Sequence, residues 1–535
     1  MIFTEKRVVS IFFIYALLAC VVVGNIAFLN AQVAENALSV RNSRFIEVGE
    51  TRGMIYDRNM LPLVNRKIST VLVIKPTEEA AAELKNELTD SDYKAVSAQL
   101  EKGNPFVFGC DYYNGSCDDI TCIQTYERYG ADDVLTHIIG YTDGEGKGTA
   151  GIERAFDELL SDASGKIGVR YFTDAEGKWL GGIETEIAEE NYASAAGLVL
   201  TIDYDVQRIC EKAMKNNSLD KGAVVVLDTE TSEILALAST PCYDRKALGA
   251  ALSDENQPFF NRALAAYPVG SVFKSVVAAA ALEKGLDESI VADCIGYSDV
   301  NSVKFNCHNR SGHGALDMQS ALAVSCNCYF ISLGLTVGSE AVITLASELG
   351  FGNGVELCDG ITASAGNLPT EADIDSSAAL ANLSFGQGTL LAAPLQLAAA
   401  YSAFANGGYY NEPHLFRFIT DSNGEIDAYY INETTKKVLT EGVCNRIMKM
   451  LAATVDEGSG KNAAPMVGRA YGKTATAETG KTENGVKKVH TWFAGIYEYE
   501  GKMYTIVVFR ENGKNSGTDC APVFRDIADA ISGKK

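Results

Sequence analysis

The sequence contains no internal repeat and no long low-complexity tract, so repeat and fibrous architectures are not indicated. It also lacks an excess of positive charge, because 46 Lys and Arg stand against 69 Asp and Glu and the net charge is -23. This balance argues against binding to a phosphate backbone and predicts an acidic surface with no nucleic-acid partner. Gly-Lys-Thr occurs at Gly472 and Gly480, but neither has the G-x-x-x-x-G-K spacing of a phosphate-binding loop. We expect no nucleotide and no other cofactor.

The composition permits large apolar cores. The chain has 535 residues, of which 47% are hydrophobic and 21% are charged. This length predicts more than one domain, and the charged fraction is ordinary for a globular protein.

One long apolar run, from Val8 to Leu29, contains no charged residue. A helix of that length spans about 33 Å, enough for a bilayer core. Lys6 and Arg7 precede it, which predicts a cytoplasmic N-terminus and an extracytoplasmic remainder. A cleaved signal peptide is the alternative, and the segment ending at Cys20 loosely resembles a lipoprotein cleavage site. The apolar run continues past Cys20, which favours a single uncleaved anchor.

The tetrad from Ser271 to Lys274 (S-V-F-K) places a hydroxyl and an amine on one face of a predicted helix. A tight loop precedes it, an apolar run continues to Lys284, and Gly285 marks the end. Residues i and i+3 are neighbours on a helix, so the Lys274 nitrogen can reach the Ser271 oxygen. A lysine on a buried helix is costly unless it is paired or neutral, and a neutral lysine is a base that can activate a serine.

Two further motifs follow in order along the chain. Ser325–Asn327 (S-C-N) comes after an amphipathic stretch, and Lys473–Ala475 (K-T-A) lies in a segment predicted as a strand. The order S-x-x-K, S-x-N, K-T-G is that of penicillin-binding proteins and serine β-lactamases. Ala475 stands where the third motif usually has glycine.

Several other segments extend the match from about residue 50 to about residue 510. They are Arg52–Asn59, His137–Tyr141, Gly151–Glu153, Asn261–Ala263, Ser384–Gly388, Ala405–Gly408 and Trp492–Gly495. With these segments the sequence resembles the class B penicillin-binding proteins, which are monofunctional transpeptidases. We find no E-D-x-x-F glycosyltransferase signature, which argues against the bifunctional class A type.

The resemblance implies a mixed α/β (α+β) fold, an antiparallel sheet flanked by helices with the active site beside an edge strand. It also implies an N-terminal non-catalytic pedestal and one transmembrane helix. The expected domains are 1–30 (cytoplasmic tip and anchor), 31–195 (pedestal, of a dimerisation type) and 196–535 (transpeptidase domain). Five strands are predicted, at Ala223–Leu227, Glu233–Ala238, Gly468–Glu478, Val489–Tyr497 and Met503–Arg510.

The resemblance also implies a catalytic set. Ser271 attacks the carbonyl between two terminal D-alanines of a peptidoglycan stem peptide, and Lys274 takes the hydroxyl proton. Burial and the positive charge of Lys473 are expected to lower the pKa of Lys274. Ser325 relays a proton to the leaving amine, and Asn327 holds the substrate backbone and Lys274.

The binding set follows in the same way. Lys473 and Thr474 grip the terminal carboxylate of the substrate. By family analogy the backbone N–H groups of Ser271 and Thr476 stabilise the oxyanion, and one such donor is typically worth ~3 kcal/mol. The methyl of Ala475 either crowds the substrate face of the strand or points at the Ser271 helix.

Three other functions share parts of this pattern. A β-lactamase needs an efficient deacylating base, for which no convincing glutamate motif is present. A D,D-carboxypeptidase differs only in using water as the acceptor. A membrane-anchored scaffold or sensor that binds β-lactams without turnover finds its support in Ala475. We favour the transpeptidase, with stem peptides and β-lactam antibiotics as ligands and a membrane glycan polymerase as partner.

Thirteen cysteines are present, an odd number that excludes complete internal pairing. Cys294 and Cys307 bracket a short segment before the S-x-N motif, and Cys110, Cys117 and Cys122 form another group. Neither group has zinc-site spacing, so we expect a structural disulfide or buried free thiols and assign no metal. His490 is expected to be a structural strand residue.

Overall fold

The computed structural model describes residues 12–27, 43–130, 133–174, 179–180, 185–430, 434–483 and 485–533. The chain divides into two compact units. The first comprises Met1–Arg52, Asn65–Arg128 and Ser164–Ser194, and the second comprises Gly53–Val64, Tyr129–Ala163 and Ala195–Lys535. Two segments of the range 31–195, which was predicted as the pedestal, therefore belong to the second unit.

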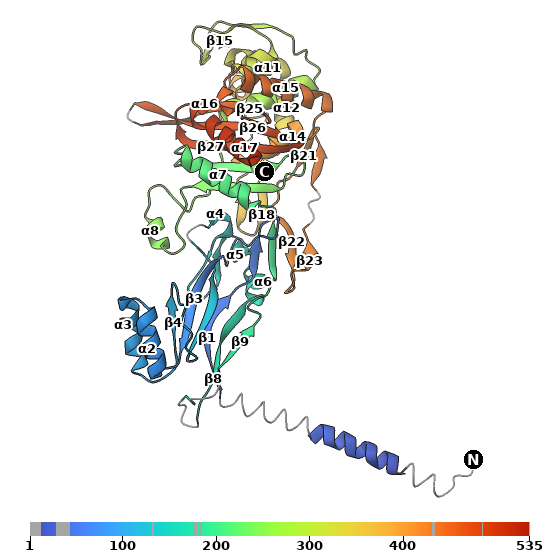
Figure 1. Ribbon diagram of the computed structural model, residues 1–535. Helices are drawn as coiled ribbons and strands as arrows, with labels where there is room; N and C mark the ends of the chain where they lie inside the picture. The colour runs from blue at the N-terminus through green and yellow to red at the C-terminus, as the bar shows by residue number, and fades with distance from the viewer. Residues whose placement is uncertain are drawn as a thin grey trace, which may run out of the picture. The chain divides into compact units, whose positions relative to one another are not determined.

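The first unit contains two three-stranded antiparallel sheets and a pair of helices. One sheet has the order β1 (Ser43–Thr51), β8 (Gly165–Phe172), β9 (Glu186–Glu190), and the other β4 (Phe106–Cys110), β3 (Lys67–Ile74), β5 (Ile120–Glu127). Helices α2 (Glu78–Glu87) and α3 (Asp90–Leu100) begin at threonines whose hydroxyls accept a backbone N–H. Leu72 and Ile74 of β3 share a buried cluster with Leu84 and Val96 of the two helices, which lie beside this sheet (Figure 1).

A five-stranded antiparallel sheet forms the centre of the second unit. Its order is β12 (Ile234–Thr240), β11 (Gly222–Asp228), β27 (Lys502–Gly513), β26 (Val486–Tyr499), β25 (Arg469–Glu483). All neighbours pair antiparallel. The five predicted strands are all present, and β25, which carries the third motif, is an edge strand.

Side chains alternate between the two faces of this sheet, as the strand repeat requires. On one face Val224 and Val508 join a buried cluster with α7 (Tyr204–Asn216) and α17 (Ala521–Ser532). On the other face Val225 and Phe509 join a larger cluster that contains α9 (Lys274–Glu283) and α14 (Pro394–Ala405). Helices therefore cover both faces, and the predicted mixed α/β fold is confirmed (Figure 1).

Further helices and short strands complete the second unit. The helices are α4 (Thr136–Ile139), α5 (Gly151–Ala155), α6 (Asp157–Asp162), α8 (Leu248–Leu252), α10 (Met318–Ala323), α11 (Asn327–Val337), α12 (Ser339–Glu348), α13 (Ser377–Ser384), α15 (Glu441–Asp456) and α16 (Ser516–Asp519), with 3-10 turns η1 (Gly270–Phe273) and η2 (Lys461–Ala463). Paired short strands are β6 (Tyr141–Thr142) with β7 (Gly148–Ala150), β13 (Tyr267–Pro268) with β20 (Leu391–Ala392), β14 (Ala292–Cys294) with β17 (Gly314–Leu316), β15 (Tyr297–Val300) with β16 (Val303–Asn306), β18 (Val355–Cys358) with β19 (Ile361–Ala363), and β21 (Tyr409–Asn411) with β24 (Thr435–Lys437).

A second sheet in this unit explains why the N-terminal motif Arg52–Asn59 belongs to it. The sheet order is β2 (Met54–Tyr56), β10 (Gly197–Leu200), β22 (Phe416–Thr420), β23 (Ile426–Tyr429), with β2 parallel to β10. The buried carboxylate of Asp57 accepts backbone N–H groups from Asn59, Leu61 and Tyr204. This carboxylate therefore ties the motif to the start of α7.

No single helix among the described residues is long and apolar enough to cross a membrane. Phe12–Ala27 is a shorter apolar helix, and α11 and α12 meet the same requirement only as a pair bent by 97°. The ends of the predicted span Val8–Leu29 lie outside the described residues.

Candidate active site

The turn that carries Ser271 lies against the edge strand β25. Gly270 has a φ of +61°, and a Cβ on it would lie 3.1 Å from the Cβ of Ala477. Its N–H donates to the carbonyl of Gly386 at 3.0 Å. Glycine is thus required before Ser271 both by the left-handed backbone and by the close approach of the strand. Ser271 itself is half-buried in η1.

Gly386, from the Ser384–Gly388 segment, supports this turn from the other side. It has a φ of +77°, and a Cβ on it would lie 1.9 Å from the carbonyl oxygen of Gly270. Gly388 has a similar φ of +90°, but there a Cβ would meet only Asn382 at 3.6 Å. The family resemblance includes this segment, and the close approach to Gly270 is the physical reason for glycine at position 386.

The family resemblance implies Ser271 as the nucleophile, and Gly386→Ala is expected to slow its acylation about tenfold or more, because the new methyl would push the Gly270 carbonyl and the serine turn. A tenfold change in rate corresponds to about 1.4 kcal/mol in the barrier. Labelling kinetics with a fluorescent penicillin measure this rate. Gly388→Ala is the matched control, because it carries similar backbone strain without the collision. Equal slowing in both variants would contradict the role assigned to Gly386.

Lys274 is the first residue of α9 and is fully buried. Its Nζ donates to the carbonyl of Ser325 at 2.8 Å, to the Ser325 hydroxyl at 3.2 Å and to Oδ1 of Asn327 at 2.7 Å. Residues 275 to 282 of α9 are also buried, so the predicted apolar, buried helix is confirmed, although it begins at Lys274 and Ser271 lies in the preceding 3-10 turn η1. The structure thus brings Lys274, Ser325 and Asn327 together from segments about fifty residues apart.

The Ser325–Asn327 turn joins two helices. Helix α10 ends at Ala323, Ser325 takes a φ of +58°, and Asn327 is the first residue of α11. A non-glycine residue in the left-handed region is uncommon and is held there by its surroundings. This backbone directs both the hydroxyl and the carbonyl of Ser325 at Lys274.

The third motif lies on β25. Lys473 is fully buried and its Nζ donates to the carbonyl of Thr474 at 2.9 Å. The Thr474 hydroxyl shares a 2.6 Å hydrogen bond with Ser459, whereas Thr476 is exposed. Because Ala477 on the same strand lies beside Gly270, β25 runs next to the serine turn.

Ala475 is buried, and only 2% of its surface is exposed. It belongs to the apolar cluster that includes Val272 and Trp492, and it lies opposite Trp492 in the register of β25 and β26. The methyl group therefore fills core volume rather than the exposed face of the edge strand, which agrees with the second of the two orientations expected.

The two buried lysines have perturbed protonation. Burial lowers the pKa of Lys274 to about 8, although nearby cysteines oppose this shift. The pKa of Lys473 is held well below its ordinary value by burial and then by the charge of Lys274. Burial therefore acts on Lys274 as predicted, whereas repulsion between the two lysines lowers the pKa of Lys473.

Arg262 is a buried charge that the sequence did not single out. Its guanidinium donates to the Glu511 carboxylate at 2.8 Å and to the carbonyl of Asn256 at 2.8 Å. The backbone N–H of Arg262 donates to the Ser239 hydroxyl. These contacts fasten the segment before Ser271 to β12 and β27. In the sequence, only the family match at Asn261–Ala263 pointed to this position, and it did not indicate a buried charge.

His490 has a structural environment. Its Nδ1 accepts the N–H of Asn512 at 3.2 Å, and its ring packs edge-on against Tyr267 and Phe509. Burial lowers its pKa to about 4, so it is neutral at physiological pH.

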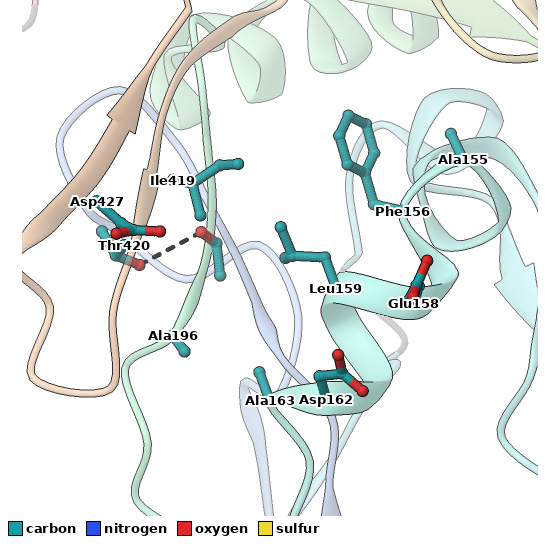
Figure 2. A pocket seen from close by; sticks show the side chains of 11 residues that line it. Ala155, Phe156, Glu158, Leu159, Asp162, Ala163, Ala196, Ile419, Thr420 and Asp427 are labelled. Atoms are coloured by element: carbon teal, nitrogen blue, oxygen red, sulfur yellow. Dashed lines mark hydrogen bonds between the residues drawn. The ribbon is translucent and has the colours of Figure 1, made fainter.

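A hollow elsewhere in the second unit has a different lining. Phe156, which precedes α6, and Leu159, within α6, face Ile419 and Thr420 of β22 across it (Figure 2). Asp427 also lines the hollow. Its lining includes no residue of the three motifs, so it contains neither the serine hydroxyls nor the buried lysines of the candidate active site.

The family model described as the penicillin binding protein transpeptidase domain matches residues 222–529. The chain belongs to this family. The match covers the five-stranded sheet and all three motifs, and it confirms both the family and the transpeptidase activity expected from the sequence.

Relatives of this transpeptidase extend beyond the matched domain. Stage V sporulation protein D of Bacillus subtilis is 27% identical over 524 residues, which cover 91% of this chain and 78% of that protein. Peptidoglycan D,D-transpeptidase MrdA of Haemophilus influenzae is 27% identical over 455 residues, which cover 78% of this chain and 66% of that one. A solved peptidoglycan synthase complex gives a TM-score of 0.69 at 23% identity, covering 99% of both chains. The likeness in fold is thus not confined to the matched transpeptidase domain.

Proposed function

We propose that this chain is a peptidoglycan D,D-transpeptidase that cross-links stem peptides through an acyl-enzyme on Ser271. The observation that carries the proposal is the buried amine of Lys274, held by Ser325 and Asn327 and lowered in pKa to about 8. An amine with a pKa of about 8 is neutral in about a tenth of molecules at pH 7 and in about half at pH 8, and the neutral form is the one that a general base requires. The curated relative MrdA is named a peptidoglycan D,D-transpeptidase, which supports this activity.

Proton transfer follows from the donor inventory of Lys274. As an ammonium it has three N–H donors, and three acceptors surround it. As a neutral amine it has two donors and one lone pair, which takes the Ser271 proton when the hydroxyl attacks the carbonyl. The adjacent Ser325 hydroxyl passes a proton to the leaving D-alanine amine. The acyl group then transfers to the amine of a second stem peptide.

Lys473 couples substrate binding to this base. Two ammonium groups buried near each other are costly, so loss of a proton from one stabilises the charge on the other. A substrate carboxylate bound by Lys473 and Thr474 favours charge on Lys473, and this charge in turn favours neutral Lys274. The exposed Thr476 on the edge strand supplies, with Ser271, the two backbone N–H groups for the oxyanion.

The second-order rate of acylation by a β-lactam should rise about tenfold per pH unit between pH 6 and 7 and level off above about pH 8. The rate rises with pH because the neutral form of Lys274 is the active base, and it levels off because the pKa of Lys274 is lowered to about 8. Stopped-flow labelling at constant ionic strength measures the profile. A rate that stays flat from pH 6 to 9 would contradict neutral Lys274 as the base.

Acylation and deacylation distinguish the alternative functions. The full-length chain is labelled with a fluorescent penicillin beside Ser271→Ala, and the label is followed over time. Stable label that is lost in Ser271→Ala, together with cross-linking of stem peptides, supports the transpeptidase. Rapid loss of label would indicate a β-lactamase. Release of D-alanine without cross-linking would indicate a D,D-carboxypeptidase. Stable label without any turnover of stem peptide would indicate a β-lactam-binding scaffold.

The organisation around this domain is also a proposal. Residues 1–30 would form a cytoplasmic tip and membrane anchor, of which the apolar helix Phe12–Ala27 is the described part. Residues 31–195 would supply the pedestal, and 196–535 the extracytoplasmic transpeptidase domain. The solved peptidoglycan synthase complex, described as coordinating polymerization and crosslinking, supports a membrane glycan polymerase as partner. Recovery of the chain in the membrane fraction, and its loss on deletion of residues 1–30, tests the anchor.

A further inference from the structure

Tyr401 of α14 has a fully buried hydroxyl beside the serine turn. It belongs to the apolar cluster that also contains Val272. Its hydroxyl donates to the carbonyl of Val272 at 2.9 Å and lies 3.1 Å from the Ser275 hydroxyl. Val272 directly follows Ser271, and Ser275 directly follows Lys274. One side chain therefore contacts the residue after the serine and the residue after the lysine.

We propose that Tyr401 is a positioning residue that sets how Ser271 lies relative to Lys274, by holding the junction between η1 and α9. This role rests on the proposed function, because it matters to the reaction only if Lys274 activates Ser271. Tyr401 acts through the backbone carbonyl of Val272 and through Ser275, which are its described hydrogen-bond partners.

The direction of the two hydrogen bonds follows from the protons available. A tyrosine hydroxyl has one proton and a carbonyl has none, so the Tyr401 proton is used by Val272. The Ser275 hydroxyl then donates to the Tyr401 oxygen. All three residues are fully buried, so rotation of either hydroxyl would leave a buried group without its partner. The three groups therefore form a directed and rigid chain of hydrogen bonds.

The junction that this chain holds sets the geometry of the S-x-x-K tetrad. Ser271 lies in the 3-10 turn η1, the Lys274 N–H donates to the Ser271 carbonyl, and α9 begins at Lys274. Residues three apart eclipse each other in a 3-10 turn, whereas they are about 60° apart around the axis of an α-helix. A side chain that bonds to a helix carbonyl is one cause of such a change in winding. Tyr401 thereby keeps Ser271 in line with Lys274.

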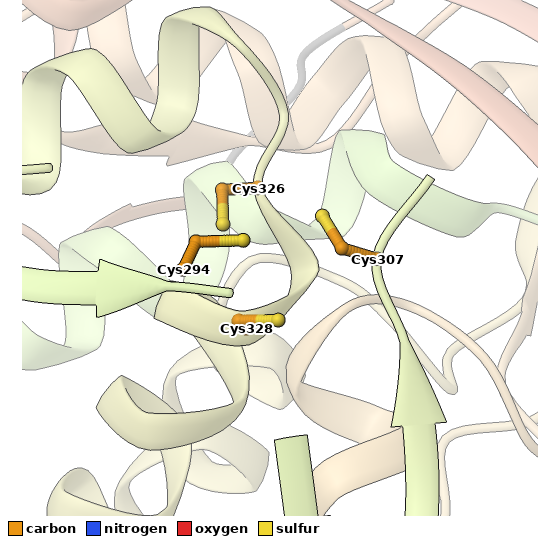
Figure 3. A group of neighbouring side chains, drawn as sticks. All are labelled: Cys294, Cys307, Cys326 and Cys328. Carbon is orange, nitrogen blue, oxygen red and sulfur yellow. The ribbon is translucent and has the colours of Figure 1, made fainter. Parts of the chain in front are cut away.

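A different part of the unit fixes the amine of Lys274, which contacts Ser325 and Asn327. At this turn and next to it lie four buried cysteines whose sulfur atoms are within 4.8 Å of one another, Cys294, Cys307, Cys326 and Cys328 (Figure 3). They are free thiols, one of the two states expected for Cys294 and Cys307. Among the described residues, the hydrogen-bond partners of the Lys274 amine do not include Ser271. The position of the serine relative to the amine therefore depends on the η1–α9 junction.

Helix α14 is itself fastened to the central sheet. The hydroxyls of Ser402, next to Tyr401, and of Thr505 on β27 are 2.9 Å apart. Thr505 shares a second 2.9 Å hydrogen bond with Thr229, which follows β11. All three of these hydroxyl-bearing residues are buried. The tyrosine therefore reaches the serine turn from a helix that the sheet holds in place.

Removal of one hydroxyl in Tyr401→Phe tests this role in the full-length chain, purified in detergent. We expect the first-order rate constant for acylation at saturating fluorescent penicillin to fall about tenfold, because a displaced serine attacks less well. The dissociation constant of the non-covalent complex should stay within about twofold, since binding precedes the attack. A merely structural role would instead lower the fraction of chains that label and leave the rate constant unchanged.

Tyr497→Phe is the matched control. Tyr497 is also fully buried, and its hydroxyl donates to the backbone carbonyl of Val467 at 2.9 Å. It belongs to the cluster on the face of the sheet opposite α9. Its rate constant for acylation should stay within about twofold of that of the unmutated protein. Equal slowing in both variants would overturn the positioning role.

Ser275→Ala tests the directed chain. We expect it to slow acylation about two- to fivefold, and to add no further slowing when combined with Tyr401→Phe, because both changes act through the Val272 carbonyl. Slowing that multiplies in the double variant would contradict a single chain.

Two further measurements separate this inference from the proposed function. Loss of all label in Ser271→Ala supports the proposed function whatever the rate in Tyr401→Phe, and an unchanged rate there overturns the positioning role alone. Hydrogen exchange of the backbone amides of residues 270–277 needs no label. We expect faster exchange in Tyr401→Phe than in Tyr497→Phe, and equal exchange would overturn the role even in a chain that did not label.

Discussion

Replacing Lys274 by methionine is expected to slow acylation of Ser271 by about 10²–10⁴-fold, the range typical for loss of a general base. Methionine has a similar unbranched length and fills the buried volume, so the change removes mainly the amine. That amine makes the contacts to Ser325 and Asn327 described above. The measurement is the second-order rate constant for labelling by a fluorescent penicillin.

Lys284→Met on the same helix is the matched control. Lys284 lies at the exposed end of α9, where its amine donates only to the carbonyl of Val337 among the contacts described. Its replacement should leave the labelling rate within about twofold of the unmutated protein. Similar slowing in both variants would point to damage to α9 and not to loss of a base.

A pH profile separates a base from a merely structural lysine. The unmutated protein should show the rise toward about pH 8, because the neutral fraction of Lys274 increases there. In Lys274→Met the residual rate should lose this rise. If the variant kept the same profile at a lower rate, another group would be the base and Lys274 would act only by positioning.

The pairing of Ser271 with Lys274 was inferred from local spacing and stays a prediction, whereas the contacts of Lys274 with distant residues were predictable only through resemblance. Helical spacing alone relates Ser271 to Lys274, because residues three apart share a face. The contacts of Lys274 with Ser325 and Asn327 join positions about fifty residues apart, and no periodicity encodes them. The order of the family motifs supplied that pairing.

The central sheet was predictable because most of its strands are apolar and because turns separate β11 from β12 and join β25, β26 and β27 in sequence. Each of the five expected strands is present, and most are longer than expected because pairing continues into their polar ends. The division of the chain into two units was harder to predict from the sequence. β2 pairs in parallel with β10 across about 140 residues, and such non-local pairing leaves no signal in a short window.

The buried arginine before the serine is the second position where one substitution should have a large effect. Arg262→Leu is expected to lower the free energy of unfolding of the second unit by about 3 kcal/mol, because loss of one partner leaves buried acceptors unpaired. These acceptors are the Glu511 carboxylate and the carbonyls of Asn256, Gln257 and Phe260. Glu511 is about a quarter exposed, so the expected loss lies at the lower end of the roughly 3–5 kcal/mol typical for breaking a buried ion pair.

Equilibrium unfolding in urea measures this change, and the midpoint concentration should fall. Arg469→Leu is the control, since Arg469 and Asp456 are 3.8 Å apart and each more than half exposed, a pair worth little. Equal shifts would contradict a special role for Arg262. Well below the midpoint Arg262→Leu should still acylate faster than Lys274→Met, because Arg262 anchors the segment that leads to Ser271 and contacts no reacting atom.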